Sequence, residues 1–476
     1  MTKRNIFYNT LYQLINLIIP IITAPYLSRV LGADGVGISS YGRAVAGYFV
    51  LFAMLGLNNY GNRTIALSKG DKKSLSETFW QIYLTQFISS LVVLAVYVVY
   101  VLQCTGDYRL VLLLNVIYVL SSLFDINWFF FGVGEFKLTA TRNILIKIAS
   151  TVLIFLLVKE KEDVNLYVAI TATGFLIANL VLWVYLKKYV CFVRVSLQDC
   201  YKHIKPNLVL FIPALAVSVY KLMDKVMLGA LSNSVQNGYY ENTSNIVTIP
   251  LSVITALGTV MLPKISELVK NGDNEKVLAY NRDSIQLMLG ASLPFSVGLI
   301  CVADNFVPLY FGNDFIDSAI VLKLLAITCP FITIGNVVRT QFIIPWKKDN
   351  IYVQATILGA VLNFVINLIL IPGLGAVGAA IGTIAAEISV ALYQCIKVRE
   401  QFRKIPVMKD NIVFLIASII MGLAVNAVGQ LSLSATLVIA IQVLVGVLIY
   451  FVLIVIYFYK FDKGRILHWL GMLKKR

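Results

Sequence analysis

Charged side chains inside long apolar stretches are the residues of this sequence best placed to do chemistry. Arg43, Lys221, Lys225 and Lys323 lie within such stretches, and Arg29 ends the first one. Ionisable groups in a stretch of this kind are costly and mark functional sites by default. At the rise of an α-helix, Arg43 and Lys323 each lie roughly 10 Å from the outer end of their stretch. Basic groups at one level would bind an anion, and a diphosphate is the obvious candidate.

Two acidic residues accompany this basic set. Asp224 and Lys225 share a helix face with Lys221, because positions three and four apart are neighbours, and Glu241 begins the next stretch. Five bases against two acids favour a cationic cavity in the outer half of a bilayer. The alternative is that each group reaches outward to the headgroups or forms a structural pair, as Lys221 with Asp224 would.

Two further acidic residues are candidates for ion coupling. Asp125 lies near the cytoplasmic end of the fourth stretch, and Glu387 lies near the middle of the twelfth. Burial would raise the pKa of either carboxyl enough for it to take up a proton during transport. Structural pairing with a nearby arginine or amide is an equal alternative.

The elements that position these residues are fourteen hydrophobic stretches, each long enough to cross a bilayer. A hydrocarbon core of about 30 Å needs roughly 20 apolar residues of helix, and a helix satisfies its own backbone hydrogen bonds there. The predicted fold is therefore an all-α polytopic membrane protein. The predicted spans are Ile6–Ser28, Val36–Leu57, Phe79–Leu102, Leu110–Phe131, Ala140–Val158, Leu166–Leu186, Asn207–Leu228, Tyr239–Leu262, Ile285–Val302, Ile316–Val338, Tyr352–Ile371, Ala376–Cys395, Ile412–Gln430 and Ala435–Tyr459.

Basic residues between the spans predict the orientation. Of the 40 lysines and arginines, 32 fall in alternate segments, which include Arg142 and Lys147, and four fall in the opposite segments. Positive charge near span ends stays in the cytoplasm, so both termini are predicted to be cytoplasmic.

The chain also shows an internal repeat. Leu31-Gly32 follows the first span as Leu228-Gly229 follows the seventh, and a Leu-Gly pair precedes an aspartate by the same fifteen residues in both halves (Gly56 to Asp71, Gly258 to Asp273). Six spans per half place both copies on the same side, which predicts two parallel lobes around a central cavity. The predicted domains are 1–195 (helices 1–6), 196–400 (helices 7–12) and 401–476 (helices 13–14 and a basic tail).

Composition excludes several function classes. The charged fraction of 13% is that of a membrane protein, and the net charge of +16 is spread over cytoplasmic loops, which favours topology and headgroup contacts over nucleic acid. Six cysteines without a Cys-x-x-Cys motif and two histidines predict no metal site and no disulfide framework. No phosphate-binding loop for ATP and no paired-carboxylate loop are present, so neither a cofactor nor an enzymatic activity is predicted.

Several motifs resemble one known family along the whole chain. They are Tyr26-Leu-Ser-Arg-Val-Leu-Gly-Ala-Asp-Gly-Val-Gly37, Tyr60-Gly-Asn-Arg63, Asp224-Lys-Val-Met-Leu-Gly229, Gly238-Tyr-Tyr-Glu241, Leu262-Pro-Lys-Ile-Ser266 and Ile344-Pro-Trp-Lys-Lys-Asp349. Their order and spacing resemble the Wzx-type polysaccharide-repeat flippases of the multidrug/oligosaccharidyl-lipid/polysaccharide exporter superfamily.

The resemblance implies a multi-pass protein of the bacterial inner membrane that makes and breaks no bond. Relatives of this type move undecaprenyl-diphosphate-linked oligosaccharide units to the outer leaflet by alternating access, for O-antigen, capsule or related polysaccharide, with polysaccharide polymerase machinery as a further partner. The diphosphate would be held by Arg29, Arg43, Lys221, Lys225 and Lys323. A lipid II flippase and a drug/cation antiporter of the same superfamily remain alternatives, and a membrane glycan polymerase is disfavoured by the short outer loops.

Overall fold

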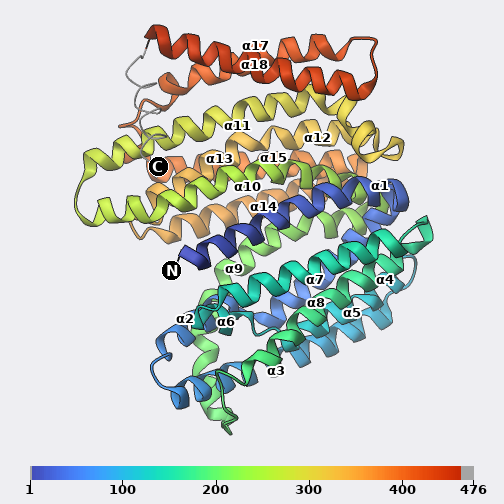
Figure 1. The fold of residues 1–476 in the computed structure, drawn as a ribbon, viewed down its shortest axis with the longest axis vertical. Coiled ribbons are helices and arrows are strands. Elements are labelled where there is room, and N and C mark those ends of the chain that lie inside the picture. The colour runs from blue at the N-terminus through green and yellow to red at the C-terminus, as the bar shows by residue number, and fades with distance from the viewer. Residues whose placement is uncertain (1–2, 462–476) are drawn as a thin grey trace. The chain divides into compact units, whose positions relative to one another are not determined.

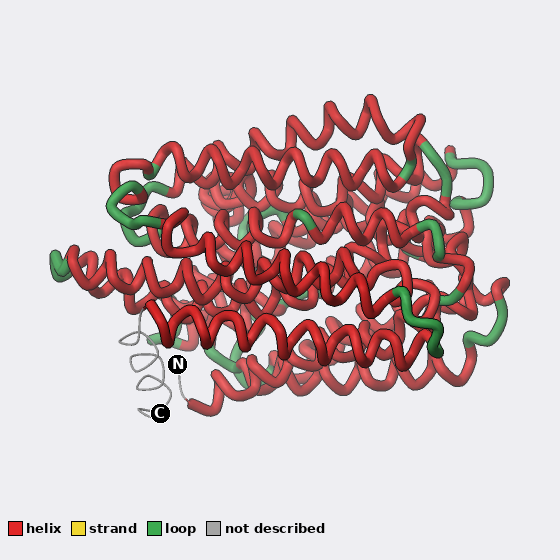
Figure 2. The backbone as a smooth tube through the Cα atoms, turned by 90° about the horizontal axis from the view of Figure 1, so that it is seen from above, coloured by secondary structure: helices red, strands yellow, loops and turns green. Residues whose placement is uncertain are grey.

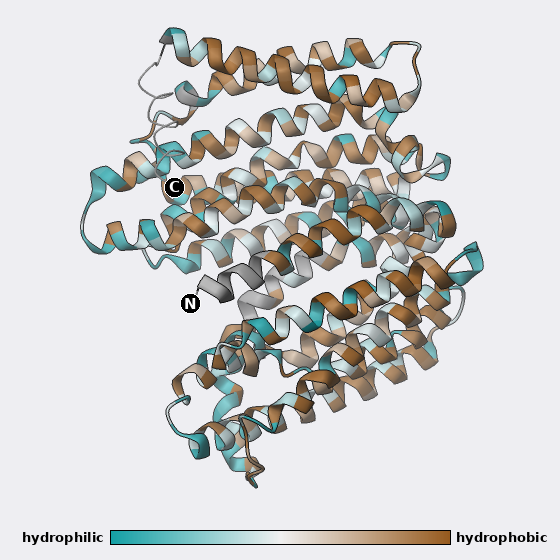
Figure 3. Cartoon of the chain, viewed as in Figure 1, coloured by the Kyte–Doolittle hydropathy of each residue, from teal (hydrophilic) through white to brown (hydrophobic). Residues whose placement is uncertain are grey.

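The computed structural model describes residues 3–461, and every regular element in that range is a helix (Figure 1). Side chains of residues 3–10, 212–214, 216, 217, 219–221, 408, 410 and 461 are outside the described set. Most connections lie at the two ends of the helices (Figure 2). Hydrophobic residues fill the middle of the helices, and hydrophilic residues gather at their ends and in the connections (Figure 3). This distribution suits helices whose middle portions contact lipid.

The chain divides into two compact units, 1–241 and 242–476. Unit 1 contains α1 (Lys3–Met54), α2 (Leu57–Leu67), α3 (Lys72–Gln103), α4 (Arg109–Leu114), α5 (Val116–Leu120), η1 (Ser121–Phe124), α6 (Asn127–Val133), α7 (Phe136–Leu157), η2 (Lys161–Asp163), α8 (Val164–Leu186), α9 (Leu197–Leu231) and the start of α10 (Ser234–Lys270). Unit 2 contains the rest of α10, then α11 (Asn274–Phe311), η3 (Asn313–Phe315), α12 (Ser318–Ala326), α13 (Thr328–Val338), η4 (Arg339–Ile343), α14 (Asp349–Leu374), α15 (Ala376–Lys397), α16 (Arg399–Phe402), α17 (Val407–Gly429) and α18 (Ala435–Phe461). The lobe boundary at residue 195 stays a prediction.

The all-α membrane fold is confirmed, but the predicted number of fourteen spans is not. Within the described residues, 12 helical segments are long and apolar enough to cross a membrane. One of them, Leu11–Leu67, covers two predicted spans, because α1 continues through a kink at Gly32 and does not end there. The backbone there has φ 69° and ψ −179°, a conformation that glycine adopts without a Cβ penalty. The helix α9, where the seventh span is predicted, is not among the 12, so fourteen stays a prediction.

Two predicted spans are interrupted rather than continuous. The fourth is divided into α4, α5, the 3₁₀ turn η1 and α6, and the tenth into α12, α13 and the π-helical turn η4. Asp125 and Ile126, between η1 and α6, leave the helical conformation. Hydropathy does not register such breaks, because the side chains remain apolar while the backbone changes course.

The core of unit 1 around α2 and α6 is aromatic. Phe79, Trp128, Phe129 and Phe130 are fully buried and pack in one cluster with leucine and isoleucine side chains. Ring centroids of Phe79 and Phe129 are 5.0 Å apart in an edge-to-face arrangement, which adds stabilisation beyond the buried area. This cluster fixes α2, α3, α6 and the end of α8 relative to one another.

Candidate functional site

Arg43 lies eleven residues after the kink at Gly32, on the second half of α1, and its side chain is exposed. The guanidinium carbon is 4.7 Å from the ring centroid of Phe175 on α8 and 5.7 Å from that of Tyr118 on α5. The aromatic faces attract the cation electrostatically. A guanidinium held in this way still offers N–H donors along its edge, in the planar arrangement that suits phosphate oxygens.

Lys147 is a second cation at a similar level. It lies ten residues before the end of α7, about 15 Å along the helix, and its Nζ donates to Asn16 Oδ1 at 2.8 Å. The charges of Lys147 and Arg43 are close enough to repel each other. An anion placed beside both would relieve that repulsion.

The assignment of Lys147 and Arg142 to the cytoplasmic segments is wrong. Both lie inside α7, and Arg142 is 5% exposed. The signal was present in the sequence, because both residues fall within the predicted span Ala140–Val158. Basic residues inside a span need a partner, which Arg142 finds in a polar network and Lys147 finds in the side chain of Asn16.

Lys225 and Glu241 form an ion pair next to this region. Lys225 Nζ on α9 is 2.5 Å from Glu241 Oε2 on α10, and each side chain is 22% exposed. Ser40 Oγ, one turn before Arg43 on α1, donates to the same carboxylate at 2.8 Å. Asp224 is buried and accepts a hydrogen bond from the Tyr240 hydroxyl. These contacts give both carboxylates structural partners, and a role for either in ion coupling stays a prediction.

Tyr167 on α8 lies near both groups. Its hydroxyl lies within electrostatic range of both Arg43 and Glu241. We name Arg43, Lys147, Lys225 and Glu241 the unit 1 charge cluster. With three bases and one acid, the cluster carries excess positive charge, which is the condition for holding an anionic cargo.

The remaining predicted anion ligands are placed differently. Arg29 is exposed near the end of the first half of α1, where its Nη1 donates to Pro25 O at 3.4 Å. Lys221 lies on α9, and its side chain is outside the described set. Lys323 belongs to unit 2, where its Nζ is 2.7 Å from Asp304 Oδ2. Asp304 was not identified from the sequence, because α11 continues nine residues beyond the predicted end of the ninth span at Val302.

Asp125 lies in the break between η1 and α6. Its Oδ1 accepts from the backbone N of Asn127 at 3.0 Å and from Asn127 Nδ2 at 2.7 Å. Arg142 Nη2 donates to Asn127 Oδ1 at 2.9 Å, and Arg142 Nη1 donates to Ala178 O at 2.5 Å. Glu387, the other coupling candidate, is half-buried on α15 in unit 2.

Side chains from neighbouring helices satisfy the carbonyl groups freed by this break. Gln86 Nε2 donates to Ser122 O at 2.7 Å and to Asp125 O at 2.8 Å. Asn179 Nδ2 donates to Ser121 O at 3.0 Å. Irregular backbone is tolerated at membrane depth only where such partners replace the helical ones. The network therefore keeps the fourth span broken at a fixed point.

The part of α1 just after its kink and the α9–α10 turn make a close backbone contact, which we name the outer contact. A Cβ built at Gly37 would overlap the carbonyl oxygen of Ser234, and one built at Gly238 would overlap the carbonyl oxygen of Ala33. Only glycine at both positions lets the two segments approach this closely. The predicted orientation puts this contact on the outer side.

Hydrogen bonds accompany the two glycines. Asn237 Nδ2 donates to Gly37 O at 3.2 Å, and the Ser234 hydroxyl donates to the Asp34 carboxylate. Gly32 and Gly229, the landmarks of the internal repeat, each lie at one end of these segments. The sequence marked Gly32 and Gly229 as repeat signals, and the contact of Gly37 with Ser234 became visible only in the fold.

His203 lies near the start of α9, before the predicted span, and is 6% exposed. Its Nδ1 is 2.6 Å from the Tyr60 hydroxyl on α2, and its Nε2 is 3.1 Å from Gln81 Oε1 on α3. Burial, followed by repulsion from Lys202, lowers the pKa of His203 from 6.5 to about 4. The imidazole is therefore neutral in the folded protein at pH 7.

We expect this histidine to make the protein less stable as the pH falls from about 6.5 toward 4. Over that range the histidine is protonated in the unfolded chain and neutral in the folded chain. The free energy of unfolding is therefore lowered by about 2 kcal/mol at pH 5 and by almost nothing at pH 7.5. His203→Gln retains an acceptor and a donor but does not titrate. The fall in thermal stability between pH 7.5 and pH 5 should be smaller for this variant than for the wild type. An equal fall in both proteins would contradict the prediction.

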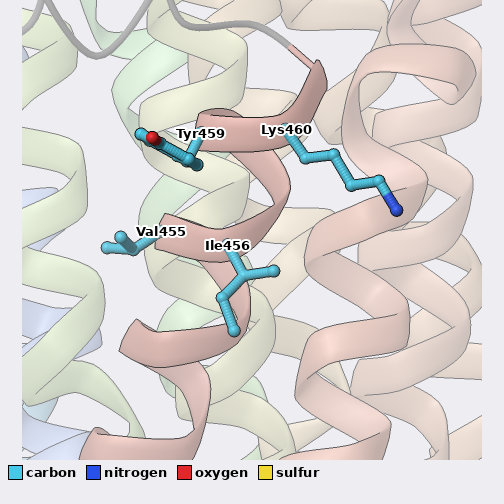
Figure 4. Close-up of a pocket in the computed structure, with 4 residues that line it drawn as sticks. All are labelled: Val455, Ile456, Tyr459 and Lys460. Atoms are coloured by element: carbon cyan, nitrogen blue, oxygen red, sulfur yellow. The ribbon is translucent and has the colours of Figure 1, made fainter.

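A pocket of about 560 Å³ lies at the C-terminal end of α18 in unit 2, lined by Val455, Ile456, Tyr459 and Lys460 (Figure 4). Val455 and Tyr459 point to one side of the helix, and Lys460 points to the other. Its wall is mainly apolar, and Ile456 and Tyr459 are 56% and 65% exposed. The pocket contains none of the predicted anion ligands.

Comparison with known proteins gives one family and several relatives. The family model described as "Polysaccharide biosynthesis protein" matches residues 2–269. A candidate O-antigen transporter of Escherichia coli (strain K12) is 23% identical over 399 residues, which cover 81% of this chain and 94% of that protein.

Two solved structures are similar in fold. The lipid II flippase MurJ in an inward closed conformation superposes with a TM-score of 0.77 at 15% identity, covering 96% of this chain and 99% of that one. A multidrug resistance MATE family transporter of the MOP superfamily, in an inward-facing conformation, gives a TM-score of 0.55 at 14% identity and covers 81% of this chain. At these identities the likeness concerns the fold alone.

Proposed function

The chain belongs to the polysaccharide biosynthesis protein family, and from this premise we propose that it is a flippase for lipid-linked oligosaccharides. The family match confirms the resemblance drawn from the sequence motifs. The cargo is a polyprenyl-diphosphate-linked glycan, which the protein moves from the cytoplasmic to the outer leaflet of the bacterial inner membrane. The candidate O-antigen transporter among its relatives supports this cargo class.

The unit 1 charge cluster is the observation that carries the proposal. Arg43 stacked on Phe175, with Lys147 nearby, presents two cations at one depth inside a largely apolar helical unit. A diphosphate has the charge to pair with both, and charge-assisted hydrogen bonds are stronger than neutral ones. A drug/cation antiporter would need a site of the opposite sign.

Two structures of similar fold have inward closed and inward-facing conformations, which supports transport by alternating access. The lipid tail stays in the bilayer while the headgroup and sugars cross past the cationic cluster. For release to the outer leaflet, the outer contact between Gly37 and Ser234 has to separate. No bond is made or broken, so the protein acts as a transporter and not as an enzyme.

Deletion of the gene tests the proposal. We expect surface polysaccharide to be lost and the lipid-linked repeat unit to accumulate on the cytoplasmic leaflet, with peptidoglycan synthesis and drug resistance unchanged. Loss of peptidoglycan synthesis would indicate lipid II as the cargo instead. Drug sensitivity with normal polysaccharide would indicate an antiporter.

A further inference from the structure

The segment that joins α8 to α9, residues 187–196, has no regular secondary structure and yet is held firmly against unit 1. Trp80 Nε1 on α3 donates to Cys191 O at 2.9 Å, and the backbone N of Cys191 donates to Ser76 Oγ at 3.0 Å. Val190 is 7% exposed and belongs to the aromatic core cluster. The segment is therefore a fixed part of the cytoplasmic end of unit 1.

Large apolar side chains project from this fixed segment and from the first turns of α9. Phe192 is 75% exposed, although its ring is 5.2 Å from that of Trp80, and Leu197 and Tyr201 are 68% and 75% exposed. Leu197 and Tyr201 are four residues apart and share one helix face. The segment follows the end of the sixth predicted span, Leu186, and precedes the seventh. These side chains thus stand at the level of the membrane interface, where aromatic residues concentrate.

Basic residues surround these apolar side chains. Residues 187–205 carry a net charge of +4, because Asp199 is their sole acidic residue. All five basic side chains are exposed: Lys187, Lys188, Arg194, Lys202 and Lys205. Asp199 is engaged in capping α9 and lies 3.9 Å from Lys202 Nζ, which leaves the other four cations available to a ligand outside the protein.

Lys264 and Lys276, on either side of the α10–α11 turn of unit 2, differ in this respect. Lys264 Nζ is 3.2 Å from Glu267, and Lys276 Nζ is 2.6 Å from Asp273. Positive charge that serves only to orient the chain can be paired in this way. Unpaired positive charge beside exposed aromatic and aliphatic side chains matches a different ligand. An anionic phospholipid offers a negative headgroup to the charges and acyl chains to the apolar side chains.

We propose that residues 187–205 form a binding platform for anionic phospholipids of the inner leaflet. Lys187, Lys188 and Arg194 contact the headgroup phosphate, and Phe192 and Tyr201 insert among the acyl chains. An acidic soluble protein fits less well, because it would leave the apolar side chains without a partner. The platform is independent of the proposed cargo, since it lies at the cytoplasmic surface and uses none of the residues of the unit 1 charge cluster.

Native mass spectrometry of the full-length protein, titrated with phosphatidylglycerol or phosphatidylcholine, tests the platform. In the variant K187Q/K188Q/R194Q we expect the affinity for phosphatidylglycerol to fall on the order of a hundredfold, since each basic residue near an anionic surface contributes roughly a fivefold factor. Affinity for phosphatidylcholine should stay unchanged.

Two matched variants separate this platform from general attraction by a basic protein. K264Q/K270Q/K276Q removes the same amount of charge elsewhere and should bind phosphatidylglycerol like the wild type. K187R/K188R/R194K keeps the charge and should do the same. An unchanged affinity in the glutamine variant, or an equal loss in K264Q/K270Q/K276Q, would overturn the proposal.

Discussion

Replacing Arg43 and Lys147 together with glutamine is expected to reduce glycan export at least a hundredfold. Arg43 lies over the ring of Phe175, Lys147 donates to Asn16, and the two positive charges are close enough to repel each other. Hydrogen bonds to charged groups contribute about 1.5–3 kcal/mol each, so the loss of two of them corresponds to roughly 10²-fold or more in cargo binding. Surface polysaccharide in a complemented deletion strain measures the effect.

Controls for this double variant follow from the geometry. Neither side chain is packed in the core, since Arg43 is exposed and Lys147 is half-buried, so protein abundance in the membrane should not change. R43K/K147R keeps both charges and should restore much of the export. Lys276→Gln, which removes an exposed basic residue in the first turn of α11, should have no effect. Purified protein should also lose affinity for farnesyl diphosphate, a probe without sugars. Undiminished export and binding in the double glutamine variant would remove the basis for an anionic cargo.

Gly37→Ala is expected to reduce export at least tenfold although it adds a single methyl group. The new Cβ would overlap the carbonyl of Ser234 and lie 2.9 Å from the backbone N of Gly238. Backbone atoms cannot turn aside as a flexible side chain can, and overpacking of this kind costs about 1–3 kcal/mol. The outer contact would therefore close less often, while the helix itself would gain from alanine.

Gly335→Ala is the matched control, because this glycine also lies in a helix and a Cβ built there meets no atom within 4 Å. It should transport normally. Closure can be followed directly in a cysteine-free background by cross-linking cysteines introduced at Asp34 and Ser234, whose side chains touch. Cross-linking should fall in Gly37→Ala and stay unchanged in Gly335→Ala. Equal cross-linking and export in the two variants would show that the outer contact does not govern transport.

Much of the fold follows from the sequence because hydropathy is a local property. A run of about 20 apolar residues determines that a segment crosses the membrane as a helix, whatever its neighbours are. The motifs around Tyr26 and Asp224 are local in the same sense, and they resemble the family to which the chain belongs. The interruption of the fourth span at Asp125 could not be predicted, because it depends on Gln86 and Asn179, which belong to other helices.

The sequence predicts that the candidate site is cationic, but it does not predict the partners of each charged side chain. Arg43 is identified by its position within an apolar stretch, and it remains the central candidate. The charge pattern places Lys147 in a loop and leaves Lys225 a free cation, although Lys147 lies inside α7 and Glu241 lies 2.5 Å from Lys225. Whether a lysine in a span has a partner depends on which helix becomes its neighbour, and the order of residues along one helix does not reveal that.

The sequence by itself thus determined that this chain is a helical membrane protein, which family it resembles and which charges are costly enough to need a purpose. The tertiary structure alone decided how those charges are used. It placed the guanidinium of Arg43 over the ring of Phe175, paired Lys323 with Asp304 and packed Gly37 against the backbone of Ser234. The physical reason is that a membrane-spanning helix can be predicted from the number of consecutive apolar residues along the chain. Ion pairs, ring contacts and backbone contacts need particular atoms, distant in sequence, to meet within a few ångströms.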